Sequence, residues 1–127
     1  MATRIAIGVD KENPYSKIIK CDGFVYIKSH IGTDPDTGET PDDTREQTRL
    51  ALEHLEHALE AAGSEVAKLV KINVYMADID AGFDAMNEAY DEFFRKQGVD
   101  GPPARTTVGS ALSWPELHVQ MDAIAVE

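Results

Sequence analysis

One arginine, Arg105, stands out among the residues of this chain that can do chemistry. It lies in Pro-Pro-Ala-Arg-Thr-Thr-Val, residues 102–108, at the start of a short β-rich segment. A guanidinium stays protonated at physiological pH, and its planar fork of N–H donors matches a carboxylate. We expect an arginine placed in this way either to hold an acidic side chain of the protein or to receive an anionic ligand.

Composition narrows the classes of partner. The chain has 127 residues, which predicts one domain over residues 1–127. Its net charge of −11, from 12 basic and 23 acidic residues, disfavours binding of nucleic acid. A single cysteine, Cys21, excludes an internal disulfide and is typical of a reducing compartment. No apolar run has the length of a membrane span or a signal peptide, so we expect a cytoplasmic protein with no membrane partner.

Hydrophobic periodicity predicts a mixed α/β (α+β) architecture. Asp22-Gly23 indicates a hairpin turn, and a polar loop over residues 32–43 precedes the first helix. The expected strands are 4–9, 17–21, 24–31, 69–76, 104–111 and 117–126, and the expected helices are 44–62 and 81–97. Apolar residues at helical spacing make both helices amphipathic: Leu52, Leu55, Leu59 and Ala62 on the first, and Phe83, Met86, Tyr90, Phe93 and Phe94 on the second, where Asn87 lies on an otherwise apolar stripe. Two amphipathic helices suffice to cover one face of a roughly six-stranded mixed sheet.

The second face of that sheet also has a recognisable pattern. In the last strand, Leu117, Val119, Met121, Ala123 and Ala125 alternate with His118, Gln120, Asp122, Ile124 and Val126. The first set suits a core covered by helices, and the second suits a surface buried against another subunit. This pattern predicts a homo-oligomer with ligand sites between subunits.

In the strand over residues 69–76, the alternation places Val70, Ile72, Val74 and Met76 on one face.

Several short motifs together resemble one known family. They are Asn13-Pro14-Tyr15-Ser16, Val25-Tyr26-Ile27-Lys28-Ser29, Asp36-Thr37-Gly38-Glu39, Ala61-Ala62-Gly63, Met86-Asn87-Glu88-Ala89-Tyr90 with Phe93-Phe94, Pro103-Ala104-Arg105 and Asp122-Ala123-Ile124-Ala125. In this order and at these spacings, the chain resembles the RidA/YjgF family of small enamine/imine deaminases over nearly its whole length.

The resemblance implies a chorismate-mutase-like fold and a homotrimer with a cleft at each subunit boundary. It implies hydrolysis of 2-aminoacrylate-like enamines and their imine tautomers to 2-keto acids and ammonia, without a metal or an organic cofactor. By position, Arg105 would clamp the substrate carboxylate. The expected catalytic residues are Arg105, Gln120 and Tyr15, and the expected substrate-binding residues are Arg105, Ser29, Asn87, Thr107 and His30.

Two positions depart from the family pattern. Gln120 stands where the family's deaminases usually have a glutamate that handles water and proton, and an amide cannot exchange a proton near neutral pH. Gln120 can instead orient a water, or it is a polar interface residue. His30 stands where many relatives have glycine, and its imidazole titrates in the useful range. A satisfied histidine at a strand end is the favoured interpretation of His30.

Two other functions follow from these residues. The amide at Gln120 favours a non-catalytic binder or sensor of small keto acids at the subunit interface. A loop containing Trp114 fits a pathway-specific deaminase of aminomuconate type. His54 and His57, three residues apart on the first helix, suit a surface metal site, but a solvated helix face is the favoured interpretation, and no metal site is expected.

Overall fold

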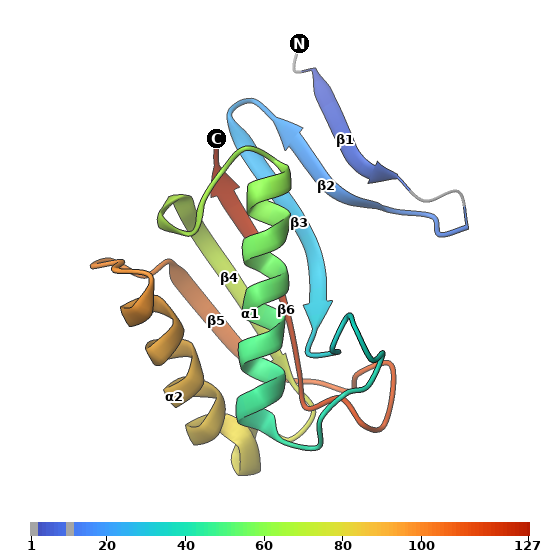
Figure 1. The fold of residues 1–127 in the computed structure, drawn as a ribbon, viewed down its shortest axis with the longest axis vertical. Helices are drawn as coiled ribbons and strands as arrows, with labels where there is room; N and C mark the ends of the chain where they lie inside the picture. The colour runs from blue at the N-terminus through green and yellow to red at the C-terminus, as the bar shows by residue number, and fades with distance from the viewer. Residues whose placement is uncertain (1–2, 10–11) are drawn as a thin grey trace.

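The computed structural model describes residues 3–9 and 12–127, and it shows one sheet with both long helices on the same face (Figure 1). The strand order is β1-β2-β3-β6-β4-β5, antiparallel throughout except for the parallel pair β4 and β5. The elements are β1 Arg4–Val9, β2 Ser16–Cys21, β3 Phe24–Ile31, α1 Thr44–Ala61, the short 3-10 helix η1 Val66–Lys68, β4 Leu69–Met76, α2 Ile79–Lys96, β5 Ala104–Gly109 and β6 Val119–Val126. The expected six-stranded mixed sheet with two helices on one face is confirmed.

Turn and cap residues account for most of the element boundaries. The β2–β3 turn has Asp22 at φ 52° and Gly23 at φ 80°, the left-handed pair that a tight hairpin requires. The side chain of Asp43 accepts a hydrogen bond from the Glu46 amide and starts α1. Asp78 accepts from the Ala81 amide in the same way, which explains why α2 begins two residues before the predicted start.

The core lies between the sheet and the helices. Leu52, Leu55 and Leu59 of α1 are buried in this core, as their spacing predicts. The prediction for β4 is wrong at one residue, because Val70 is 43% exposed while Ile72 and the following alternate residues are buried. A register shift between Leu69 and Lys71, where β4 pairs with β6, takes Val70 off the buried face.

No helix of the described chain covers the opposite side of the sheet, which we call the outer face (Figure 1). Phe24 and Tyr26 of β3 are exposed there, and they pair with Val126 and Ile124 of β6. The alternate residues of β6 are buried under the helices, as the sequence pattern predicts. A single chain therefore leaves an apolar group of side chains uncovered at one end of this face.

Two loops meet at the end of β3 and β6 that lies opposite the chain termini (Figure 1). The buried Gln47 side chain joins them: its amide nitrogen donates to the carbonyls of Pro41 (2.8 Å) and Glu116 (2.9 Å), and its oxygen accepts from the His118 amide (2.8 Å). Gly32 lies directly against the Gln47 backbone. The loops that border the candidate site are thus held to the first turn of α1.

Within the described residues, neither long helix has the apolar length needed to cross a membrane.

Candidate functional site

Arg105 lies half-buried on β5 and faces α2. Its guanidinium carbon is 4.7 Å from the ring centroid of Tyr90 and 5.8 Å from that of Phe83. No ion pair among residues 3–9 and 12–127 involves Arg105. A hollow of about 510 Å³ opens beside it, with Asn87 and Pro103 in its wall. The guanidinium is therefore supported by aromatic rings and remains available to an anion.

Tyr90 was expected only as a core residue of α2, and the structure gives it a second role. The side chain is buried, and its hydroxyl has no hydrogen-bond partner among the described residues. Burial raises the pKa of Tyr90 to about 12, although the nearby Arg105 acts in the opposite direction. The phenol therefore stays neutral, and its ring is a permanent surface for the guanidinium.

The other residues expected near Arg105 lie differently. Asn87 was placed on the apolar stripe of α2, but it is exposed and lines the hollow. Thr107 follows two residues after Arg105 on the same strand, half-buried, with a buried hydroxyl oxygen that has no partner in the described chain. Thr107 is not among the residues that line the hollow.

The remaining predicted residues gather in a second place. Tyr15, Ser29, His30 and Gln120 line one cavity of about 530 Å³. The Gln120 amide nitrogen donates to the Ser29 hydroxyl at 2.8 Å. The same two residues also line an adjoining cavity of about 450 Å³. Sequence reasoning thus identified a group of side chains that the fold does bring together.

An irregularity in β3 explains how these side chains are distributed. Ile27 pairs with Ala123 and His30 with Met121, so three steps along β3 match two steps along β6. The extra residue is a β-bulge, and it reverses the alternation of side chains beyond Ile27. Ser29 consequently reaches Gln120, which lies on the outer face, and the His30 ring lies near α1.

His30 lies in a cationic environment. Burial, followed by Lys28, His54 and Lys17, lowers the pKa of His30 to about 4. Its ring centroid is 6.0 Å from that of His54, and its buried Nε2 has no partner among residues 3–9 and 12–127. The imidazole is therefore neutral near pH 7, and the expectation of a fully satisfied strand-end histidine is wrong.

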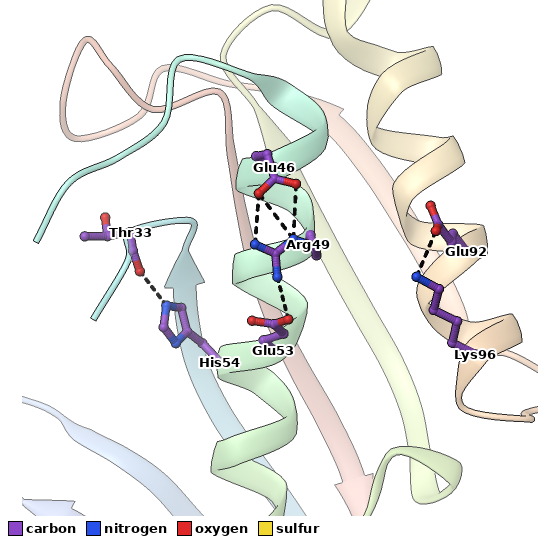
Figure 2. A network of polar contacts seen from close by, with 7 residues as sticks. All are labelled: Thr33, Glu46, Arg49, Glu53, His54, Glu92 and Lys96. Carbon is purple, nitrogen blue, oxygen red and sulfur yellow. Dashed lines mark hydrogen bonds and ion pairs between the residues drawn. The ribbon is translucent and has the colours of Figure 1, made fainter. Parts of the chain in front are cut away.

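His54 is also not on a solvated helix face, contrary to the prediction. Figure 2 shows it projecting from α1 toward the loop after β3, where its Nε2 hydrogen-bonds the Thr33 carbonyl at 2.7 Å. Since a carbonyl only accepts, Nε2 carries the proton. The charged pairs of Arg49 with Glu46 and Glu53 lie elsewhere on the same helix. The spacing of His54 and His57 in the sequence does not by itself show whether His54 faces solvent or the loop after β3.

The carboxylate nearest to Gln120 on β6 is already engaged. Asp122 lines the 450 Å³ cavity, and its Oδ1 accepts from the Asn73 amide nitrogen at 2.8 Å. Its interaction with Tyr75 raises the pKa of that phenol. Asp122 is therefore held by β4 rather than presented as a free acid.

The fold separates the two groups of predicted residues within one chain. The hollow at Arg105 and the cavity at Gln120 have no lining residue in common. Strands β6 and β4 lie between β3 and β5, and neighbouring strands are about 4.8 Å apart. A small molecule held by Arg105 on the helix side does not reach Gln120 on the outer face of the same chain.

A metal centre is not apparent in the described part of the chain, where no three His, Cys, Asp or Glu side chains group together suitably. His118 has structural partners instead: its Nδ1 lies 2.8 Å from the Thr44 hydroxyl, and its Nε2 lies 3.1 Å from an Asp42 carboxylate oxygen.

Comparisons with known proteins identify the family to which this chain belongs. The family model described as endoribonuclease L-PSP matches residues 6–127. A RutC family protein of Pyrococcus abyssi is 36% identical over 113 residues, which cover 88% of this chain and 85% of that protein. Escherichia coli TdcF, named as a candidate reactive intermediate deaminase, is 32% identical over 89% of this chain and 86% of its own length.

Solved structures give the same result. The crystal structure of E. coli TdcF with bound serine has a TM-score of 0.84 at 31% identity, covering 96% of this chain and 93% of that one. The crystal structure of the E. coli YjgF gene product has a TM-score of 0.83 at 30% identity, covering 95% and 92%. The motifs, the fold and the comparisons therefore show that this chain belongs to the YjgF/RidA family.

Proposed function

We propose that this protein hydrolyses small carboxylate-bearing enamines and imines, similar to 2-aminoacrylate and 2-iminopropionate, to 2-keto acids and ammonia. The observation that carries the proposal is the half-buried guanidinium of Arg105, which has no ion pair within the described residues and lies beside an open hollow. A buried guanidinium without a partner is costly, and a bound carboxylate removes that cost. The serine bound to the related TdcF is a carboxylate-bearing molecule of similar size.

We propose further that the site is completed between copies of the chain, in the homotrimer that the family resemblance implies. A single chain keeps Arg105 and Gln120 on different faces of the sheet, and its outer face leaves Phe24, Tyr26 and Ile124 without a covering layer. In a ring of three copies, packing the outer face of each copy against the β5 edge of the next buries this apolar surface and places the neighbour's Arg105 beside Gln120. A neighbouring copy then supplies the half of the cleft that each chain lacks.

In the proposed reaction, Arg105 binds the carboxylate through its in-plane N–H groups. A water gives a proton to the terminal enamine carbon, and the hydroxide left behind takes an N–H proton, which gives the imine. A second water, oriented by the Gln120 amide and the Ser29 hydroxyl, adds to the imine carbon. Proton transfer to nitrogen and cleavage of the C–N bond then release ammonia and leave the 2-keto acid. Tyr15 lines the cavity where this water would lie.

Substitution of Arg105 tests the chemistry. Arg105→Ala is expected to lower kcat/KM for 2-iminopropionate by about 100-fold, because a charge-assisted bidentate contact is lost. Arg105→Lys keeps the charge without the planar fork and is expected to recover only part of this loss. Unchanged hydrolysis in Arg105→Ala would refute the proposal. Arg4→Ala, which removes an exposed arginine of β1 at the opposite edge of the sheet from β5, is the matched control.

A mixing experiment tests whether the site is shared. Arg105→Ala and Gln120→Ala chains are each expected to be nearly inactive. After the two are unfolded and refolded together, about a quarter of the clefts in a trimer have both native halves, and that fraction of activity should return. A mixture as inactive as its components would show that each site lies within one chain.

The rival function is binding of a small keto acid without turnover. It is favoured by two observations: the side chain at position 120 is an amide, and the carboxylate of Asp122 is held by Asn73. A ligand at about 100 times its dissociation constant adds ~2.7 kcal/mol to the free energy of unfolding. Stabilisation by pyruvate, combined with no hydrolysis of 2-iminopropionate, would establish this alternative.

Ribonuclease activity, which the description of the family model names, is not part of the proposal. A net charge of −11 repels a polyphosphate.

A further inference from the structure

The cavity that contains Gln120 has an unusual charge balance. Lys17 and Lys28 line it together with His30 and His54, and no aspartate or glutamate of the described chain is among the lining residues. The protein as a whole has 23 acidic residues against 12 basic ones. A carboxylate-free wall with two lysines is therefore a local reversal of the overall charge, of the kind that attracts an anion.

Neither lysine is paired with an acidic side chain in the described part of the chain. Among the described residues, the Lys28 ammonium donates to the Ser29 carbonyl alone, at 3.1 Å. Burial and the charge of Lys17 lower the pKa of Lys28, so the two ammonium groups act on each other unfavourably.

The backbone holds these lysines in place. Gly8 of β1 has φ 70°, and its missing side chain leaves room for the aliphatic stem of Lys17, whose carbons lie 2.9–3.1 Å from where a Cβ would be. The bulge in β3 leaves Lys28 and Ser29 as consecutive residues of the cavity wall. Both positions are therefore determined by the fold rather than by free side-chain rotation.

One further polar atom in this cavity lacks a partner. The buried Nε2 of His30 has no hydrogen bond within the described structure. The side chains that lower the pKa of this imidazole electrostatically are all basic: Lys28, His54 and Lys17. A neutral imidazole among cations is suited to hydrogen-bond an anionic group while the lysines balance its charge.

We propose that this cavity binds a second anionic group of the ligand, between Lys17 and Lys28, so that the preferred substrate is a dicarboxylate. The inference rests on the proposed function, in which Arg105 of a neighbouring copy binds the first carboxylate. A substrate with one carboxylate leaves both lysines without a counter-ion, whereas a dicarboxylic enamine or imine satisfies the cations at both ends of the cleft. A cavity of about 530 Å³ is in the range of small-ligand sites.

The test compares two imines of equal length. 2-Iminoglutarate and 2-iminopentanoate are generated in place by oxidation of L-glutamate and L-norvaline, and they differ in a terminal carboxylate against a methyl group. The wild-type protein is expected to prefer the dianion in kcat/KM by about tenfold or more. Lys17→Gln and Lys28→Gln are each expected to lower the dianion value about fivefold and to change the monoanion value by less than about twofold.

Lys20→Gln is the matched control, because Lys20 lies on the same strand as Lys17 but pairs with Glu127 at 3.0 Å. It should leave the preference unchanged. Equal hydrolysis of the two imines by the wild type, or equal losses for both substrates in the lysine variants, would overturn the dicarboxylate inference while leaving deamination standing.

A separate binding measurement distinguishes failure of the proposed deamination from failure of the dicarboxylate inference. If neither imine is hydrolysed, titration calorimetry with 2-oxoglutarate and 2-oxopentanoate decides the matter. Tighter binding of 2-oxoglutarate that weakens in Lys17→Gln and Lys28→Gln supports the second anion site in a protein without turnover. Equal binding of the two keto acids refutes it.

Discussion

The guanidinium of Arg105 lies over the ring of Tyr90, with 4.7 Å between the guanidinium carbon and the ring centroid. The N–H groups of a guanidinium lie in its plane, so an aromatic ring against one face holds the group without using its donors. The hydrogen-bonding fork remains available for a carboxylate. Tyr90 therefore positions Arg105, although the sequence marks it only as part of a helix core.

Removing the Tyr90 ring should weaken substrate binding. Tyr90→Leu is expected to raise KM for 2-iminopropionate about three- to tenfold with a smaller effect on kcat, because a partly buried cation–π contact contributes roughly 1 kcal/mol. Tyr90→Phe keeps the ring and should leave KM unchanged. It should also raise the free energy of unfolding by about 1 kcal/mol, since it removes a buried hydroxyl without a partner. A rise in KM in Tyr90→Phe equal to that in Tyr90→Leu would contradict this role.

Gln120→Glu should accelerate hydrolysis. The new carboxyl group lies where the amide now contacts Ser29, and general acid–base catalysis contributes a factor of about 100 or more. We expect kcat for 2-iminopropionate to rise at least about tenfold. The control is Gln120→Leu, which has similar size, cannot orient water and should lose activity. Loss of activity in Gln120→Glu would show that the amide itself is required.

His30 should make the stability of the protein sensitive to acid. The pKa of its imidazole is about 4 in the folded chain against 6.5 for an unperturbed histidine. The unfolded state therefore takes up a proton first as the pH falls, so the stabilisation is complete above pH 6.5 and is lost toward pH 4. Between pH 7 and pH 4.5, the free energy of unfolding measured with denaturant should fall by about 2 to 3 kcal/mol more in the wild type than in His30→Gln. Equal losses would show that His30 is not the source.

Gly32 should not tolerate a side chain. A Cβ there would lie 2.3 Å from the carbonyl oxygen and 2.4 Å from the Cα of Gln47, both backbone atoms of α1. Gly32→Ala is expected to lower the free energy of unfolding by at least about 3 kcal/mol, because the loop must leave the helix. The control is Gly101→Ala, whose Cβ would meet no atom within 4 Å, and it should change stability by less than about 0.5 kcal/mol. Similar urea midpoints for the two variants would contradict the packing argument.

A charge on the outer face should disrupt assembly. Tyr26 and Ile124 are paired neighbours on β3 and β6. In the proposed homotrimer, Ile124→Glu would bury a carboxylate between copies, so we expect this variant to sediment as a monomer. Ala61→Glu, at an exposed position at the end of α1, should leave the sedimentation coefficient unchanged. A monomeric wild type would remove the basis of a shared cleft.

Local signals were sufficient to predict the elements of the fold. Asp22-Gly23 predicted the hairpin, and leucine spacing predicted the buried side of α1, because turn chemistry and helical periodicity depend on near neighbours. The irregularities at Ile27–His30 and at Leu69–Lys71 were not predictable, since they arise where β3 and β4 pair with β6, which is distant in sequence.

The candidate site shows the same division. Motif resemblance brought together Tyr15, Ser29 and Gln120, and the structure places them in one cavity. It did not identify Lys17 or Lys28 as members of that cavity, because surface lysines carry no periodic signal and their position depends on the bulge and on Gly8.

The chemistry of this cleft depends on strand length as well as on residue type. Lys28 and Ser29 together occupy the span of one residue in a regular strand. Deleting either one would leave a regular strand in which His30 still faces the helices, but a single side chain would then stand where Lys28 and Ser29 now line the cavity together. Relatives of similar sequence that differ here by a one-residue indel would therefore be expected to differ in substrate choice, even where each aligned residue is identical.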